Sequence, residues 1–366
     1  MLDHATSVLD LPFDLQPDPD QLIQAAMEWH FSPKTGCRFW LERARSWEFD
    51  PRTDVKSFED LTMFPNVVNE LRGVDARDLI PQGYGRDPDV VAVFESGGTT
   101  GPPKRVVMLR DWWDRVMTHA ATQFVVRGVP RKRGWLVLLP SGPHLAGQLF
   151  HIQAAAVDGV PFTIDMDPRW VKKLIGAGMV EQADAYAEHL IDQAAFLLET
   201  QDIGVLAVTP PLLDRLARRD GLVELVRRKV RVIQWGGAHM DADTRQLYRT
   251  EVFPAAKLFG MYGSTMVLGG AYERLGLSDE DPCIFDPFSP FVAFSVVDPD
   301  SRRTVAYGER GQVVMHHVSK SFLLPNNLER DMATRVPPPE GAIGDSVADV
   351  TPVQRFEDET VIEGVY

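Results

Sequence analysis

The sequence predicts an α/β protein in which parallel sheets are layered with helices, followed by a smaller β-rich subdomain. Between residues 89 and 285, short apolar runs alternate with amphipathic helical segments, a pattern typical of βαβ units and of a parallel sheet covered on both faces. After about residue 285, the apolar runs are separated only by turn-rich loops, which indicates an antiparallel or barrel-like arrangement. The chain has 366 residues, of which 44% are hydrophobic, so it can bury a sizeable core.

The individual elements follow from hydrophobic periodicity. Residues 20–46 carry apolar side chains at helical spacing, whereas residues 47–88 are broken by prolines. The expected strands are 90–94, 135–140, 162–166, 205–209, 230–235, 257–261, 291–297 and 312–318. The expected helices are 112–126, 145–157, 182–200, 212–229 and 241–253. The expected divisions are a helical N-terminal part (1–88), an α/β nucleotide-binding core (89–285), a β-rich subdomain (286–345) and an exposed acidic tail (346–366).

The composition excludes several classes of partner. The formal net charge is -14, and no nucleic acid is expected because binding to its backbone needs a basic footprint. No stretch approaches the roughly 18 apolar residues of a transmembrane helix, and the N-terminus has no signal-peptide pattern, so we expect a cytoplasmic protein that does not enter the membrane. Cys37 and Cys283 show no metal-binding spacing, which predicts reduced thiols and no protein metal site.

The loop 95–104 is the most informative segment of the chain. Its glycines let backbone N–H groups approach an anion, its hydroxyls add donors, and its lysine adds a mobile positive charge. The loop therefore predicts a polyphosphate site, with ATP as the expected ligand, although it lacks the Gly-Lys-Ser/Thr ending of the common P-loop. The alternative is a surface turn rich in Gly, Thr and Pro. The predicted phosphate-binding residues are Ser96, Gly97, Gly98, Thr99, Thr100, Gly101 and Lys104.

A second glycine segment, Trp235-Gly-Gly-Ala238, ends a predicted parallel strand. Ligands of open α/β sheets bind at the carboxyl ends of strands, and glycine there lets a flat ring lie against the backbone. Gly236, Gly237 and Ala238 are therefore candidate contacts for a base. The alternative is a plain strand-to-helix turn.

Two more segments carry candidate groups. At another strand end, Tyr262 offers a stacking face, and Gly263, Ser264 and Thr265 supply a turn with hydroxyls for a phosphate. The alternative is a turn with a core tyrosine. Asp331 lies in the charged segment 329–335, expected to follow the last strands, where an aspartate can take both ribose hydroxyls. The alternative there is a solvated run of charges.

Taken in this order, the segments resemble the adenylate-forming superfamily, which comprises acyl-CoA synthetases, adenylation domains of peptide synthetases and luciferases. The loop 96–104 looks like the family's phosphate loop, segment 235–238 resembles its adenine wall, and segment 262–265 is similar to its Tyr-Gly-x-Thr-Glu motif. Segments 57–61 and 78–81 look most like the phenylacetate-CoA ligase branch. The resemblance covers roughly residues 20–345 and implies the large N-terminal half of such an enzyme.

The resemblance implies a reaction in which a carboxylate attacks the α-phosphate of ATP, giving an acyl-adenylate and pyrophosphate. It implies that the pyrophosphate is held by Thr99, Thr100 and Lys104. It implies that Tyr262 stacks on adenine beside Gly237 and Ala238, that Thr265 contacts the α-phosphate, and that Asp331 holds the ribose. His144, near the expected acyl pocket, is a candidate to orient the carboxylate, and a plain turn histidine is the alternative.

The sequence departs from the family pattern at two places. Met266 replaces the glutamate that helps to hold Mg²⁺, and its thioether does not suit a hard cation, so Mg²⁺ is expected to be held weakly or atypically. Only 35 residues follow Asp331, fewer than the roughly 50 of a small domain, and segment 344–349 looks like a degenerate hinge. We therefore expect no C-terminal family domain, adenylation without thioester formation, and transfer of the product to a separate reductase or transferase.

The predicted function is ATP-dependent activation of a carboxylic acid, which the phenylacetate-like branch implies is aromatic. A further resemblance, to the adenylating proteins of phenazine antibiotic pathways, implies a phenazine carboxylate as substrate class. Related ligases are often dimers, which points to a homodimer. The alternative function is a catalytically weakened nucleotide- or acyl-adenylate-binding protein, or a scaffold of a biosynthetic pathway. Met266 favours that alternative, whereas the intact phosphate loop favours the enzyme.

Overall fold

The computed structural model describes residues 8–96, 102–278, 281–353, 355–356 and 359–360, and these form two compact units. Unit 1 takes in the chain up to His119, Ser264–Gly270 and Asp286–Val347. Unit 2 takes in Ala120–Gly263, Ala271–Phe285 and the chain from Ala348 onward. The polypeptide passes between the units several times, so neither is a continuous segment.

Unit 2 is built on the predicted parallel sheet. Its strands lie in the order β8-β7-β6-β5-β3-β4, and the pairs from β7 to β4 are all parallel. Their bounds are β3 Gly134–Leu138, β4 Val160–Thr163, β5 Ile203–Val208, β6 Val232–Gly236, β7 Lys257–Ser264 and β8 Gly269–Glu273. Strands β3, β5 and β6 are buried along their whole length, as expected for a sheet covered on both faces.

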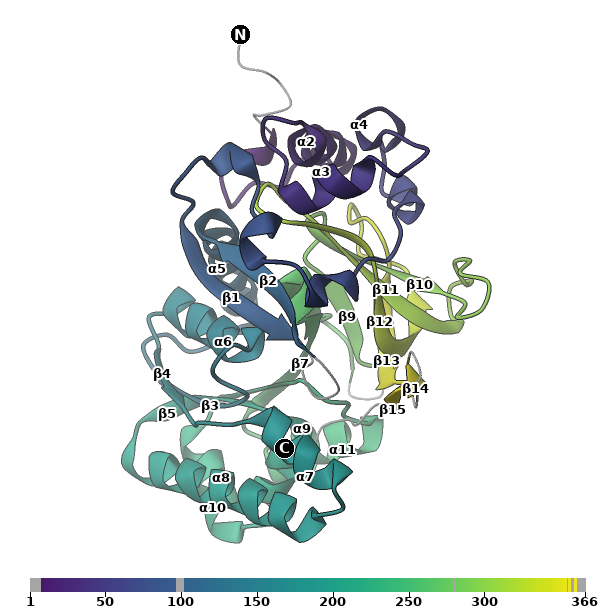
Figure 1. Ribbon diagram of the computed structural model, residues 1–366. Helices are drawn as coiled ribbons and strands as arrows, with labels where there is room; N and C mark the ends of the chain where they lie inside the picture. Colours follow the sequence, from purple (N-terminus) through teal and green to yellow (C-terminus); the bar gives the residue numbers. More distant parts are fainter. Residues whose placement is uncertain (1–7, 97–101, 279–280, 354, 357–358, 361–366) are drawn as a thin grey trace. The chain divides into compact units, whose positions relative to one another are not determined.

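Helices cover both faces of this sheet. Figure 1 shows α6 on one side of β3 and β4, with α8 and α10 on the other side. Their bounds are α6 Leu145–Ala156, α7 Pro168–Gly176, α8 Val180–Thr200, α9 Pro210–Ala217, α10 Asp220–Lys229 and α11 Ala242–Leu247, the last followed by a π turn, Tyr248–Val252. The single helix predicted over 212–229 is wrong, because Arg219 adopts an extended conformation and separates α9 from α10. Its guanidinium is instead held by Glu188 and Asp192 of α8.

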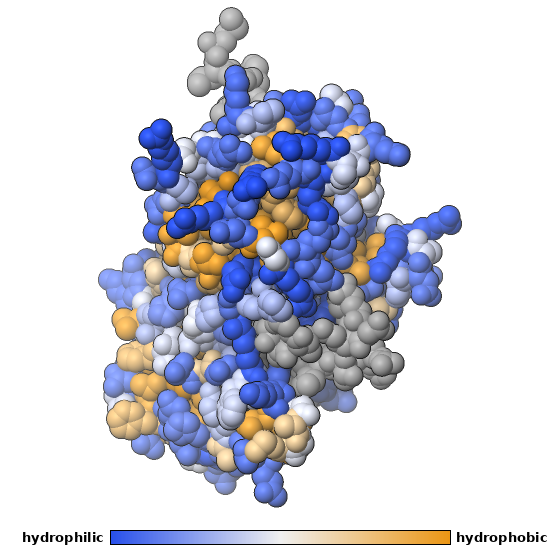
Figure 2. Space-filling model, viewed as in Figure 1, coloured by the Kyte–Doolittle hydropathy of each residue, from blue (hydrophilic) through white to orange (hydrophobic). Residues whose placement is uncertain are grey.

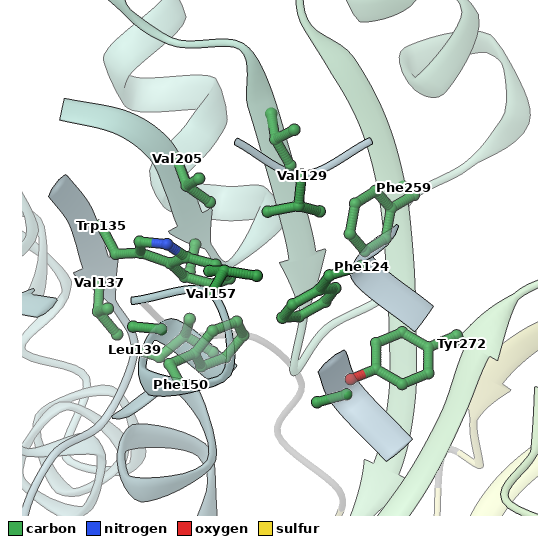
Figure 3. Packing of buried hydrophobic residues seen from close by; sticks show 14 residues of the cluster. Phe124, Val129, Trp135, Val137, Leu139, Phe150, Val157, Val205, Phe259 and Tyr272 are labelled. Atoms are coloured by element: carbon green, nitrogen blue, oxygen red, sulfur yellow. The ribbon is translucent and has the colours of Figure 1, made fainter. Parts of the chain in front are cut away.

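A large aromatic cluster fills the core of unit 2. Figure 3 shows Trp135 of β3 packed with Phe124 and Phe150, and with Phe259 and Tyr272 at the other end of the cluster. The ring centroids of Phe124 and Trp135 are 5.5 Å apart. Burial of these rings fixes the strands whose carboxyl ends carry the predicted ligand-binding segments.

Unit 1 combines short helices with antiparallel strands. Its helices are α2 Pro19–Phe31, α3 Arg38–Ala44, α4 Pro51–Asp54 and the first part of α5 Arg110–Arg127, with 3₁₀ turns at Glu59–Met63, Glu70–Arg72, Ala76–Leu79 and Gln82–Tyr84. Strands β10 Val292–Val297, β11 Arg310–Val318 and β12 Leu323–Val336 pair antiparallel, which confirms the predicted change of pattern. Segment 90–94 does not join a parallel sheet, because β1 Val90–Ser96 pairs antiparallel with β2 Lys104–Leu109.

The last strands modify the expectation for the end of the chain. Strand β9 is Ile284–Pro287, β13 is Ser346–Pro352, and the pair β14 Arg355–Phe356 and β15 Glu359–Thr360 is antiparallel. Val347 and Ala348 are fully buried, so the segment expected to be an exposed tail begins as a packed strand. The adjacent apolar residues Val347 and Ala348 are the only local sign of this burial in a segment that otherwise carries polar and acidic residues.

The face of the molecule seen in Figure 2 is largely hydrophilic, in keeping with the net charge of -14. Apolar side chains gather over the part of unit 1 that β1 occupies, where Val90 and Val93 are 41% and 39% exposed. Within the described residues, none of the helices has the length and apolar character needed to cross a membrane.

Candidate functional site

The predicted phosphate loop joins the two strands of the β1–β2 hairpin. Ser96 is the last residue of β1 and pairs directly with Lys104, the first residue of β2. The five residues between the strands' ends that were predicted to bind phosphate (Gly97, Gly98, Thr99, Thr100 and Gly101) lie outside the described residues. The hairpin therefore fixes the spacing of the two loop ends, and it places the lysine at a strand end.

Two arginines that the sequence analysis missed lie beside this loop. Arg72 donates a hydrogen bond from Nη1 to the carbonyl oxygen of Pro102 at 2.8 Å, which anchors the far end of the loop. Arg105 forms an ion pair with Glu95, with Nε 2.9 Å from Oε1. Arg72 and Lys104 place two cations at the ends of a loop rich in donors, a suitable setting for a polyphosphate, whereas Glu95 offsets the charge of Arg105.

In unit 2, the strand register places two predicted segments side by side. Strand β6 ends at Gly236, which lies beside Met261 of β7, and Trp235 lies beside Gly260. A Cβ at Gly236 would lie 2.8 Å from the carbonyl oxygen of Met261, and a Cβ at Gly260 would lie 2.6 Å from the Trp235 ring. Gly237 follows with a φ of 80°, a conformation that favours glycine. The close approach of two strand ends thus requires the glycines that the sequence shows.

Tyr262 follows at the end of β7, half-buried, on the same carboxyl edge of the sheet as Gly237 and Ala238. Its ring lies 5.8 Å from that of Phe285, and Phe285 also packs edge-on against Trp235 at 5.9 Å. The sequence analysis did not find Phe285, because only the fold brings residue 285 against strands that end at 236 and 264. Phe285 therefore links the glycine segment to the tyrosine expected to stack on a base.

The sequence analysis also missed the hydrogen bonds that hold β7 through the buried side chain of Glu273. Glu273 is 5% exposed, and its Oε2 accepts a hydrogen bond from the backbone N–H of Gly260 at 2.7 Å. Its Oε1 lies 2.6 Å from Nη2 of Arg249, so the buried carboxylate is both paired and hydrogen-bonded. This arrangement holds the first half of β7 in place and thereby supports the strand that carries Tyr262.

In unit 1, Ser264 and Thr265 begin a tight turn directly after Tyr262 and Gly263. The turn, Thr265–Val267, packs against β1, β2, β11 and β12, so it lies beside the phosphate-loop hairpin. The Ser264 hydroxyl accepts a hydrogen bond from the N–H of Met266 at 3.3 Å. Thr265 is half-buried, and its hydroxyl has no hydrogen-bond partner among the described residues, so it can serve a ligand.

Asp331 lies inside a strand, and the expectation that it follows the last strands is wrong. It is half-buried in the second half of β12, next to Met332, which pairs with Gln312 of β11. The charged run 329–335 was expected to follow the last strands, but the pairing with β11 continues past an irregularity near Gln312, and the strand extends to Val336. The aspartate and the turn at Thr265 belong to the same unit, and the turn packs against β12.

His144 lies just before the first residue of α6, with its backbone extended, and its side chain does not cap the helix. It follows β3, so it belongs to the same carboxyl edge of the parallel sheet as Gly236 and Tyr262. The side chain is half-buried. This placement is compatible with a role in orienting a substrate, which stays a prediction.

Met266 is 3% exposed, and its side chain belongs to the core of unit 1. It cannot act as a hard-cation ligand in this position. Among the described residues, no group of three or more His, Cys, Asp or Glu side chains has the arrangement of a metal site. Cys37 and Cys283 are buried free thiols, and burial raises both pKa values, that of Cys37 to about 12.

One cavity of unit 1, about 170 Å³ in volume, does not coincide with any predicted site residue. It lies between the start of the described chain and α5. Its walls include Phe13, Asp111, Trp112, Arg115 and Lys320.

No family model and no curated protein sequence matches this chain. Solved structures do resemble it. A 2-hydroxyisobutyryl-CoA ligase in the postadenylation state with 2-HIB-AMP gives a TM-score of 0.62 at 14% identity, over 94% of this chain and 73% of the ligase. The same ligase with R3-HIB-AMP gives 0.61 at 14% identity, over 90% of this chain and 65% of the ligase. ATP-bound MatB from Rhodopseudomonas palustris gives 0.50 at 16% identity, over 72% of this chain and 48% of MatB.

The fold is that of the N-terminal part of an adenylate-forming enzyme. This confirms the predicted fold class, in which a mostly parallel sheet with helices is accompanied by antiparallel strands. The chain spans about two thirds of the length of the ligase in one of these comparisons, and about half the length of MatB. At these identities, the likeness establishes the fold and leaves the chemistry to the residues of this chain.

Proposed function

We propose that this protein activates a carboxylic acid with ATP, forming an acyl-adenylate and releasing pyrophosphate. A carboxylate oxygen attacks the α-phosphorus, and the bond from that phosphorus to the bridging oxygen of the β-phosphate breaks. Pyrophosphate leaves with the bonding electrons. Such a displacement needs a fixed position for the nucleotide and positive charge on the leaving phosphates.

The observation that carries the proposal is the register of β6 against β7. It lays Gly236 beside Met261 and sets Trp235 against Gly260, so that a flat backbone wall and Tyr262 share one sheet edge. In this proposal Tyr262 stacks on adenine against Gly237 and Ala238. The likeness to a ligase bound to an acyl-adenylate supports this assignment.

The groups of unit 1 are assigned to the phosphates and the ribose. Lys104, with Ser96 at the opposite loop end, is proposed to neutralise the leaving pyrophosphate, and the Thr265 hydroxyl to contact the α-phosphate. Asp331 is proposed to bind the ribose hydroxyls. Neither Met266 nor any acidic cluster in the described residues fits a protein-held Mg²⁺. We therefore assign no step to a metal held by this chain.

The substrate is proposed to be an aromatic acid, with phenazine carboxylates as one class, on the resemblance of segments 57–61 and 78–81 to phenylacetate-CoA ligases. His144 is proposed to orient its carboxylate. The adenylate is proposed to pass to a separate acceptor enzyme, and the protein to act as a homodimer in the cytoplasm. These finer assignments rest on the sequence resemblance and on the edge of the sheet at which His144 lies.

The second candidate is a nucleotide-binding protein that no longer adenylates, and the burial of Met266 favours it. Carboxylate-dependent exchange of pyrophosphate into ATP separates the two candidates. The panel should contain phenylacetate, benzoate, phenazine-1-carboxylate and 2-hydroxyisobutyrate, with a no-acid background. Exchange above background that Lys104→Ala abolishes supports the enzyme. Binding of ATP without exchange for any acid contradicts it.

A further inference from the structure

The turn that carries Thr265 is closed by a backbone hydrogen bond, and side chains from other elements also hold it. The Thr265 carbonyl accepts a hydrogen bond from the N–H of Leu268 at 3.2 Å, which closes a 3₁₀ turn. Leu268 has a φ of 50° and a ψ of 33°, a left-handed conformation that a leucine adopts only when its surroundings hold it there. The turn is therefore not determined by local preference alone.

Two buried side chains bind the carbonyl oxygens of Val267 and Leu268 in this turn. Nδ1 of His317, on β11, lies 2.6 Å from the carbonyl oxygen of Val267. Nε1 of Trp112, on α5, donates to the carbonyl oxygen of Leu268 at 2.9 Å. His317 is fully buried, Trp112 is 1% exposed, and Val267 and Leu268 are fully buried. Water cannot replace either donor, so loss of a donor leaves a buried carbonyl unsatisfied.

The protonation of His317 follows from its partners. A carbonyl oxygen only accepts, so Nδ1 carries the proton and donates to Val267. Nε2 then accepts from the hydroxyl of Ser319, 2.7 Å away. Burial lowers the pKa of His317 to about 3, which keeps the ring neutral in this tautomer. Both nitrogens are thus used to hold the imidazole in one orientation.

The ring faces of His317 are also enclosed. The Trp112 ring lies 4.3 Å from the imidazole at an angle of 58°, and Phe322 packs edge-on at 5.2 Å. The two donors therefore support one another as well as the turn. His316, which precedes His317 in the sequence, points to the opposite face of β11. There its ring contacts the Ser295 hydroxyl and accepts a hydrogen bond from the N–H of Asn326.

We infer that His317 and Trp112 are positioning residues for Thr265, which bind the Val267 and Leu268 carbonyls and so hold the Thr265 hydroxyl toward the α-phosphate of bound ATP. This inference rests on the proposed function, because it assigns a purpose to a turn whose ligand is part of that proposal. Thr265 at the start of the turn is half-buried, whereas Met266, Val267 and Leu268 are buried. A misplacement of about 1 Å at such a group can lower a rate by about 100-fold.

The test compares His317 with His316, which is equally buried and adjacent in sequence. His317→Asn keeps a donor at the position of Nδ1, whereas His317→Leu removes it. His316→Asn and His316→Leu are the matched controls. Trp112→Phe removes the indole N–H together with the second ring of the indole, and it keeps one aromatic ring in place. Carboxylate-dependent exchange is measured for each variant with ATP varied, so that maximal rate and apparent KM are obtained separately.

We expect His317→Leu and Trp112→Phe to lower the maximal exchange rate by about tenfold or more, on the scale of a misplaced catalytic group. His317→Asn should recover most of that loss, and both His316 variants should stay within about threefold of wild type. Equal losses in His316→Leu and His317→Leu, or no difference between His317→Asn and His317→Leu, would overturn the inference.

Amide hydrogen exchange of peptides covering 264–270 provides a readout that does not need activity. His317→Leu should raise the rate of amide hydrogen exchange in this segment, and His316→Leu should not. If wild type shows no adenylation with any acid, the proposed function fails and this measurement alone decides the positioning. Unchanged protection of 264–270 in His317→Leu would refute it.

Discussion

Replacing Met266 by glutamate would place the acidic residue of the adenylate-forming motif in a position that is buried in this protein. Met266 is 3% exposed, so the new carboxyl would be desolvated and would fold in its neutral form. Protonation of the new carboxyl limits the free-energy cost of burying it. Neutralising a carboxyl with an ordinary pKa of about 4.3 at pH 7 costs about 3.7 kcal/mol, and at pH 5 about 1 kcal/mol. We therefore expect Met266→Glu to destabilise the protein by about 3.7 kcal/mol at pH 7 without raising its exchange activity.

Urea unfolding of wild type and Met266→Glu at both pH values tests this reasoning. The difference in unfolding free energy should shrink by about 2.7 kcal/mol between pH 7 and pH 5, because groups common to both proteins cancel. Met266→Leu is the control and should cost less than about 1.5 kcal/mol at either pH. A Met266→Glu protein as stable as wild type at pH 7, with faster pyrophosphate exchange, would refute the burial of this side chain and restore a metal-binding role to the position.

Three further predictions follow from packing, charge and burial. Gly260→Ala puts a Cβ 2.6 Å from the Trp235 ring and should destabilise the protein by about 1–3 kcal/mol. Gly221→Ala in α10 is the control, because its Cβ would have no neighbour within 4 Å, and it should stabilise the protein by about 0.5–1 kcal/mol. Equal effects of the two variants in chemical denaturation would contradict the packing of β6 on β7. Lys104→Ala should lower pyrophosphate exchange by about tenfold or more, and the exposed Lys34→Ala should not; comparable rates for both would remove Lys104 from the site. Unfolding free energy should fall as the pH drops from 6.5 to 5, by about 2 kcal/mol per buried histidine, because burial depresses the folded pKa of His30 to about 4 and of His316 and His317 to about 3. The contribution of these neutral rings is complete above the unfolded pKa near 6.5, and a flat stability profile between pH 7 and pH 5 would be the contrary result.

Periodicity alone was sufficient to predict most of the parallel sheet. Strands β3, β5 and β6 are continuous apolar runs in the sequence, and the structure places all three in the sheet of unit 2. Gly236 was identified from the sequence as a motif residue, yet a contact between two strands is what requires glycine at 236 and at 260. The sequence showed that glycine occurs there, and only the fold shows what a Cβ would meet.

Errors arose where pairing or packing overrides a local pattern. The charged run 329–335 was expected to follow the last strands, but pairing with β11 makes it part of β12. The helix predicted over 212–229 breaks at Arg219, whose side chain is held by acidic residues of α8. Phe285 and His317 were not identified as site residues, because each acts through neighbours distant in sequence. Arg72 was missed for the same reason, since its partner Pro102 is 30 residues away.

The central claim is that this chain forms acyl-adenylates, and carboxylate-dependent ATP–pyrophosphate exchange measures that step directly. The account predicts exchange above the no-acid background for at least one acid of the panel, with loss in Lys104→Ala and retention in Lys34→Ala. Mass spectrometry of the same mixture should detect the corresponding acyl-AMP. A well-folded protein that binds ATP but gives neither exchange nor acyl-AMP with any acid would contradict the claim and leave a nucleotide-binding protein.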